Sequence, residues 1–145
     1  MPAAAPLAPR PAQPAPLGDD PQSAYNIAYG YVLTGDYGLA EESFRAWLAA
    51  FEGQPQTVDA RFWLGESEFQ QKNYSAAAKS FLDLYNTAAD SPKGPEALVR
   101  LGMSLRELGE KDAACSTFGE VGKKYPGAAE TLKNRVKEES ARAGC

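Results

Sequence analysis

A repeat of 37 residues is the feature of this sequence that most restricts its fold. Phenylalanine recurs at Phe44, Phe81 and Phe118, and an alanine stands four residues before each of them. A period between about 20 and 50 residues is typical of stacked supersecondary units, none of which can bury its apolar face alone. The interval therefore predicts three copies of one unit, packed against one another in chain order.

Each copy contains two predicted helices joined by a tight turn. A small residue in the first helix, such as Gly65 or Gly102, allows the second helix to approach closely, and the phenylalanines fill the remaining space. Glycine in two of the three turns permits a positive φ, and Asp36 and Asn73 are suited to cap the helices that follow. We expect helices over residues 22–34, 37–51, 58–71, 74–88, 95–108 and 111–124.

Proline and glycine divide the chain between these units, and no proline falls inside a predicted helix. Residues 1–20 are rich in proline and alanine without apolar periodicity, which is typical of a linker. After the third copy the chain is polar, with Leu132 and Val136 on one stripe, as expected of a helix that caps a repeat array. The predicted domain covers 21–145, with repeats at 21–57, 58–94 and 95–126 and the capping helix at 127–142.

The repeated residues resemble the tetratricopeptide repeat. The third copy carries the most complete motif, with Leu101-Gly102, Gly109, Ala114, Phe118 and Pro126, and the second keeps Leu64-Gly65, Tyr74, Ala77 and Phe81. The resemblance implies an all-α fold, in which three helix pairs and a capping helix form a right-handed superhelix. It also implies that the concave face of this superhelix binds other proteins.

The groove of such an array is lined mainly by the first helix of each repeat. The family's groove positions correspond here to Tyr25, Tyr29, Val32, Phe62, Glu66, Phe69, Val99, Met103 and Arg106. This set is richer in aromatic and apolar residues than a solvated face needs, which favours an apolar helix or an extended segment as the ligand. The alternative is that several of these side chains, Tyr25 and Phe62 especially, pack between repeats and never meet a ligand.

Further features resemble one branch of this family, the YbgF/CpoB proteins of the Tol–Pal system. They are the long period, the Pro/Ala-rich linker, the segments Asp59–Glu66 and Leu101–Leu105, and the Gly144-Cys145 ending. The resemblance implies a periplasmic adaptor that binds TolA, with a peptidoglycan synthase as a further partner, and coordinates outer-membrane constriction with peptidoglycan synthesis in cell division. It also implies a signal peptide and an oligomerising coiled coil upstream of Met1, so this segment alone is expected to be monomeric.

Two other interpretations stay open: a scaffold of another envelope assembly or secretion complex, and the non-catalytic domain of a larger periplasmic enzyme.

The composition of the chain excludes several kinds of catalytic and binding site. No histidine is present, which removes Ser-His-Asp and Cys-His nucleophile pairs and His-ligated zinc, and two cysteines are too few for a structural zinc site. A net charge of -4 does not suit the capture of nucleic-acid phosphates. No apolar run is long enough to span a bilayer. We expect a non-catalytic protein without metal or cofactor.

The two cysteines, Cys115 and Cys145, leave two alternatives. If the capping helix runs antiparallel to the sixth helix, a short tail through Gly144 allows a disulfide that closes a loop of about 30 residues, worth about 2–4 kcal/mol. Otherwise Cys115 is a buried apolar side chain and Cys145 is a free thiol at a frayed end. A periplasmic location favours the disulfide.

Overall fold

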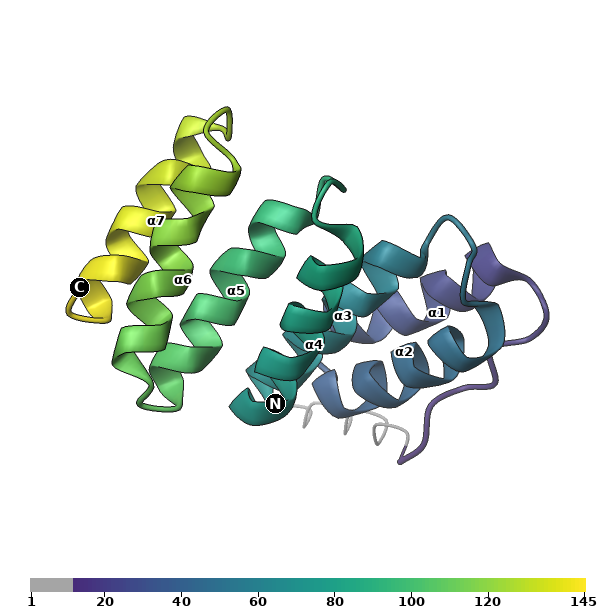
Figure 1. Cartoon of the computed structure of the whole chain (residues 1–145). Coiled ribbons are helices and arrows are strands. Elements are labelled where there is room, and N and C mark those ends of the chain that lie inside the picture. Colours follow the sequence, from purple (N-terminus) through teal and green to yellow (C-terminus); the bar gives the residue numbers. More distant parts are fainter. Residues whose placement is uncertain (1–11) are drawn as a thin grey trace, which may run out of the picture.

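The computed structural model describes residues 12–145, which form seven α-helices stacked in chain order (Figure 1). Their bounds are α1 Pro21–Leu33, α2 Tyr37–Phe51, α3 Thr57–Gln70, α4 Tyr74–Ala88, α5 Gly94–Glu107, α6 Lys111–Lys124 and α7 Glu130–Arg142. This part of the chain contains no strand, and none of its helices combines the length and the apolar character needed to cross a membrane. The fold is the all-α helical repeat that the sequence predicts, with residues 1–11 of the expected linker outside the described range.

The first six helices begin and end within one residue of their predicted bounds. Asp20 caps α1, because its carboxylate accepts a hydrogen bond of 2.8 Å from the backbone N–H of Ser23. The capping expected of Asp36 and Asn73 is wrong in one respect: both hold N-cap positions, but neither side chain bonds to the first turn of its helix. Their ψ angles of 67° and 71° differ from the 120° of Asp20. Asp36 instead accepts a hydrogen bond from the hydroxyl of Thr34 at 2.7 Å.

The turn inside each helix pair places one residue in the left-handed region. Gly35 and Gly109 have φ values of 76° and 80°, and Lys72 holds the equivalent place in the second repeat with a φ of 63°. Glycine adopts this conformation without a steric penalty, whereas a residue with a Cβ atom loses about 1–2 kcal/mol. Packing of the two helices must therefore impose the turn at Lys72.

Close approach within each pair depends on the small residues that the sequence indicated. A Cβ atom on Gly65 would lie 2.8 Å from the ring of Phe81, and one on Gly102 would lie 2.6 Å from the ring of Phe118. Phe44, Phe81 and Phe118 are each at most 1% exposed. The predicted interlocking of glycine and phenylalanine is confirmed in the second and third repeats.

Charged side chains also lie between the repeats. Glu68 is buried on α3, where it accepts a hydrogen bond from the hydroxyl of Ser80 and forms an ion pair of 3.1 Å with Arg45. Burial raises the pKa of Glu68, and the contacts with Ser80 and Arg45 oppose that rise. Glu66 on α3 and Arg100 on α5 form a second pair at 3.2 Å, which links the second and third repeats.

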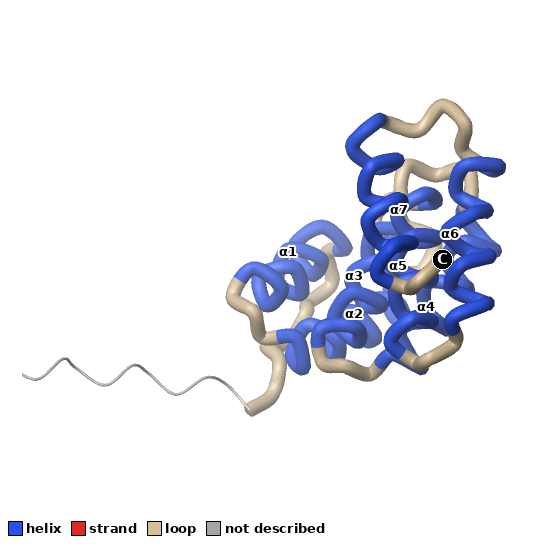
Figure 2. Tube along the Cα trace, turned by 90° about the vertical axis from the view of Figure 1, so that its left-hand side faces the viewer, coloured by secondary structure: helices blue, strands red, loops and turns tan. Residues whose placement is uncertain are grey.

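The helix α7 caps the array, as predicted, although it begins at Glu130 and not near residue 127. Figure 2 shows it at the C-terminal end of the stack, where it contacts both α5 and α6. Cys115 of α6 and Cys145 form a disulfide, with their Cα atoms 5.5 Å apart. Of the two alternatives that the sequence left open for the cysteines, the structure therefore has the bridged one.

Candidate partner-binding surface

Four aromatic side chains from α1 and α3 form a row that we term the aromatic strip: Tyr25, Tyr29, Trp63 and Phe62. The ring centroids of Tyr25 and Tyr29 are 6.0 Å apart, with ring planes 11° from parallel. Tyr29 lies 5.2 Å from Trp63, and Trp63 lies 5.3 Å from Phe62. The row of ring contacts therefore crosses from the first repeat to the second.

Side chains of the core hold the buried side of the aromatic strip in place. Tyr25 packs edge-on against Phe44 and Trp47, with ring centroids 5.7 Å and 6.4 Å away. Phe62 is only 4% exposed and packs against Phe81, whereas Tyr25 and its neighbours Tyr29 and Trp63 are half-buried. Rings held in this way lose little side-chain entropy on binding, which makes them suitable anchors for a partner.

The hydroxyl of Tyr25 stays protonated under ordinary conditions. Burial raises the pKa of Tyr25 to about 12, the negative charge of Asp59 acts in the same direction, and a hydrogen bond with Trp63 opposes them. Tyr25 therefore contributes no negative charge to the aromatic strip at neutral pH.

A single positive charge lies at the Phe62 end of the aromatic strip. Lys93, the residue just before α5, places its ammonium nitrogen 4.5 Å from the ring centroid of Phe62 and 5.6 Å from that of Trp63. Both distances are within the range of cation–π attraction, worth about 0.5–1 kcal/mol at a partly exposed site. The surface thus combines an apolar row with a cation at the Phe62 end, while the charge of Asp59 acts on Tyr25. An apolar segment with an acidic residue beside Lys93 would complement this arrangement.

The structure divides the predicted groove residues between two environments. Tyr25, Tyr29, Val32 and Phe69 are half-buried on α1 and α3. Phe62, Glu66, Val99 and Met103 are buried, with exposures of 4%, 5%, 0% and 8%. Val99 has no surface left for a ligand, because it lies in the core shared by the second and third repeats.

Arg106, the last predicted groove residue, is held by the capping helix. Its guanidinium donates a hydrogen bond to Glu139 of α7, and the two side chains are 16% and 5% exposed. Burial alone would lower the pKa of Arg106, but the hydrogen bond and charge of Glu139 raise it. Arg135 of α7 forms a further ion pair of 3.4 Å with Glu96 of α5. The helix α7 therefore engages α5, and the half-buried members of the predicted groove lie in the first two repeats.

Two residues of this surface, Trp63 and Lys93, are absent from the groove positions predicted from the sequence. The residues 37 positions before and after Trp63 are Asn26 and Arg100, so the repeat gave no signal at this position. Lys93 lies between two repeats and reaches the rings only through the turn that precedes α5. A tryptophan in the middle of the first helix of the second repeat was the one visible sign, since tryptophan often anchors partners.

The sequence comparisons agree with the repeat architecture. Family models for the tetratricopeptide repeat match residues 25–92 and 96–128, which span most of the helical array. The chain belongs to the tetratricopeptide-repeat family. No enzyme family matches it, and a search of curated proteins gives no significant match.

Within the described residues, no cluster of Cys, Asp or Glu side chains is placed to hold a metal ion. Repeats of this family typically form non-catalytic scaffolds, and membership of the family suggests a scaffold for protein–protein interaction.

Proposed function

We propose that this scaffold is a periplasmic adaptor of the Tol–Pal system, which binds TolA through the aromatic strip. In this role it coordinates outer-membrane constriction with peptidoglycan synthesis during cell division, and a peptidoglycan synthase is its second partner. The proposal is supported by membership of the tetratricopeptide family and by the residues that resemble the YbgF/CpoB branch, among them Asp59–Glu66, which contributes Phe62 and Trp63 to the aromatic strip.

The disulfide between Cys115 and Cys145 supports the periplasmic location. Structural disulfides persist in oxidising compartments such as the periplasm and are rare in the cytosol, where thiols are kept reduced. The bridge joins α6 to the end of the chain and is therefore part of the fold of the capping region.

The aromatic strip is the single observation that carries the proposed binding mode. Trp and Tyr are the residue types that most often dominate binding energy, and here Tyr25, Tyr29 and Trp63 are held by the core yet keep part of their surface exposed. An apolar helix or extended segment of TolA would lie along these rings, with an acidic residue beside Lys93.

Affinity for the periplasmic region of TolA tests this proposal. Replacing Tyr29 or Phe69 with alanine is expected to weaken binding, and Trp63→Ala, which removes the central ring, is expected to weaken it most, by about tenfold or more. Circular dichroism should show unchanged helicity. Leu82→Ala is the matched control, because Leu82 is an exposed apolar side chain on α4, outside the aromatic strip. Equal affinity of Trp63→Ala and Leu82→Ala for TolA would overturn the proposal.

A further inference from the structure

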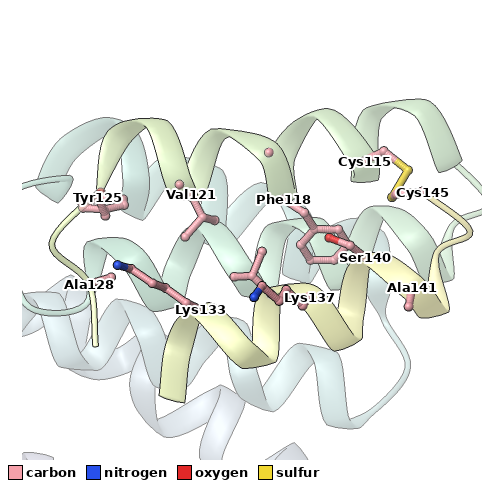
Figure 3. A pocket seen from close by; sticks show the side chains of 13 residues that line it. Cys115, Phe118, Val121, Tyr125, Ala128, Lys133, Lys137, Ser140, Ala141 and Cys145 are labelled. Carbon is pink, nitrogen blue, oxygen red and sulfur yellow. A yellow bond between two sulfur atoms is a disulfide. The ribbon is translucent and has the colours of Figure 1, made fainter. Parts of the chain in front are cut away.

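A hollow of about 630 Å³ lies between α6 and α7, far along the chain from the aromatic strip (Figure 3). Phe118 and Val121 of α6 line its inner side, where they are only 1% and 2% exposed, and Tyr125 follows the end of α6. Val136 lines the hollow from α7. The disulfide between Cys115 and Cys145 lies at one end of the hollow. We term this hollow the α6–α7 groove.

Two glycines of α6, Gly119 and Gly122, line the groove and leave it open. At the same places in the 37-residue repeat, α4 carries Leu82 and Tyr85. A Cβ atom on Gly119 or Gly122 would meet no atom within 4 Å, so neither glycine is needed for close packing. Glycine inside a helix lowers its stability by about 1 kcal/mol relative to alanine. A stability penalty without a packing reason is typical of a functional site.

The facing helix also lacks the residues that would close the groove. At the 37-residue interval, the buried Leu98 and Leu101 of α5 correspond to Arg135 and Glu138 of α7. These polar side chains cannot make the apolar contact that α5 makes with the preceding helix. Leu132 and Val136 of α7, and Ala143 just after it, pack against the core. The helix is also attached by the disulfide and by its ion pairs with α5, and a hollow remains along α6.

The charge in the groove is unevenly placed. Lys133 and Lys137 line it from α7, and no acidic residue does. Lys133 has only a loose ion pair, with Glu130 at 3.7 Å, and within the described chain Lys137 has no ion pair or hydrogen bond. Lys133 lies toward the Tyr125 end of the groove and Lys137 near its middle, and both are away from the disulfide (Figure 3). The groove thus has an uncharged sulfur-lined end and a cationic remainder.

We propose that the α6–α7 groove binds the free carboxylate form of a long-chain fatty acid, with the hydrocarbon chain along the exposed backbone of Gly119 and Gly122 and the carboxylate beside the lysines. The volume lies within the range of about 300–1,000 Å³ that is usual for small-ligand sites. From Cys115 to Tyr125 the groove follows α6 for about 15 Å at 1.5 Å per residue. An extended chain of about twelve carbons is similar in length, since each C–C bond of about 1.5 Å advances a zigzag chain by roughly 1.3 Å.

Isothermal titration with dodecanoate, kept below its critical micelle concentration, tests this assignment on the whole chain with its disulfide intact. We expect one saturable site. The double variant Gly119→Leu with Gly122→Tyr restores the side chains of α4, and it should abolish binding while leaving the helical circular dichroism and the melting temperature unchanged or higher. Gly30→Ala is the control, because a Cβ atom there also meets nothing within 4 Å but Gly30 lies on α1.

Charge reversal gives an independent measurement that does not depend on filling the groove. Lys133→Glu with Lys137→Glu should weaken dodecanoate binding by about tenfold or more, because two ammonium groups near the carboxylate become two carboxylates. Dodecanol, which lacks the charge, should bind the unmodified protein more weakly than dodecanoate does and should be insensitive to the reversal. Absence of dodecanoate binding, or binding that the filled variant retains, overturns the proposal. So does a result in which an acidic amphipathic peptide binds the groove and dodecanoate does not.

Discussion

The α4–α5 and α6–α7 junctions hold the same place in successive repeats, yet one is closed and the other open. In the closed junction, Tyr85 of α4 packs against the core that includes Leu98 and Leu101 of α5. In the open junction, Gly122 takes the place of Tyr85, and the hollow of about 630 Å³ follows. The backbone period is the same in both cases.

The difference between the two junctions separates two determinants of this array: the repeat interval and the side chains at each junction. The repeat interval fixes where each helix lies, because the buried phenylalanines and their small partners recur in every pair. The side chains at each junction decide whether neighbouring pairs close against each other. The open junction is held by the apolar side chains of α7 that reach the core, and by two further attachments, the disulfide and the Arg106–Glu139 pair.

The largest expected effect comes from removing the attachment of the open junction. Cys145→Ser opens a loop of 30 residues, for which the chain-entropy account gives a loss of about 3.5 kcal/mol. Amide hydrogen exchange should show that α7 loses protection while α4 and α5 keep theirs. Ser116→Ala, an exposed change on α6, is the control. Unchanged protection of α7 in Cys145→Ser would show that the open junction does not depend on the disulfide.

The closed junction should be intolerant of added volume. A Cβ atom on Gly94, at the start of α5, would lie 2.1 Å from the carbonyl oxygen of Ala89 and 2.7 Å from the hydroxyl of Tyr125, which donates a hydrogen bond to that carbonyl. Gly94→Ala is expected to lower the free energy of unfolding by about 3 kcal/mol, measured by urea denaturation. A loss below about 1 kcal/mol would mean that this junction is less tightly packed than its contacts indicate.

The open junction should respond to the same substitution with the opposite sign. Gly119→Ala and Gly122→Ala add a methyl group where nothing lies within 4 Å, and each removes an interior helical glycine. Each is expected to raise the free energy of unfolding by about 1 kcal/mol, measured under the same conditions as Gly94→Ala. Destabilisation by either variant would contradict the account of the groove.

The smallest effect concerns the closed interface between the first two repeats, where Glu68 is buried. Burial raises the pKa of Glu68 above its usual 4.5, so the folded chain holds this proton more tightly than the unfolded chain. The free energy of unfolding should therefore decrease as the pH rises above 4.5 toward the raised pKa. Glu68→Gln should flatten this slope in thermal melts recorded at several pH values. A slope equal to that of Glu120→Gln, a change at an exposed carboxylate, would show that Glu68 does not titrate in this way.

The sequence predicted the array well because its determinants are local and repeated. Helix bounds follow from proline, glycine and the recurrence of Phe44, Phe81 and Phe118, and the structure confirms them closely. The surface was harder to predict, since it depends on contacts between repeats. Nothing local shows that Glu139 reaches Arg106 or that Val99 is fully buried.

The α6–α7 groove is the clearest example of a feature beyond the reach of sequence reasoning. Gly119 and Gly122 are visible in the sequence, but a missing side chain makes a hollow only where the facing helix fails to fill it. The bridge between Cys115 and Cys145 ties the segment that follows α7 to α6, and the sequence left that bridge undecided. The central ring of the aromatic strip, Trp63, was missed for a related reason, because its place in the repeat has no aromatic counterpart.

The most direct test of the account is to map the amide chemical shifts of the chain by NMR as the periplasmic region of TolA is added. The account predicts shift changes at residues of α1 and α3 around Tyr29 and Trp63, and at Lys93, with the α6–α7 groove unaffected. Changes confined to α6 and α7, or no changes at all, would contradict the claim that the aromatic strip is where this scaffold binds its partner.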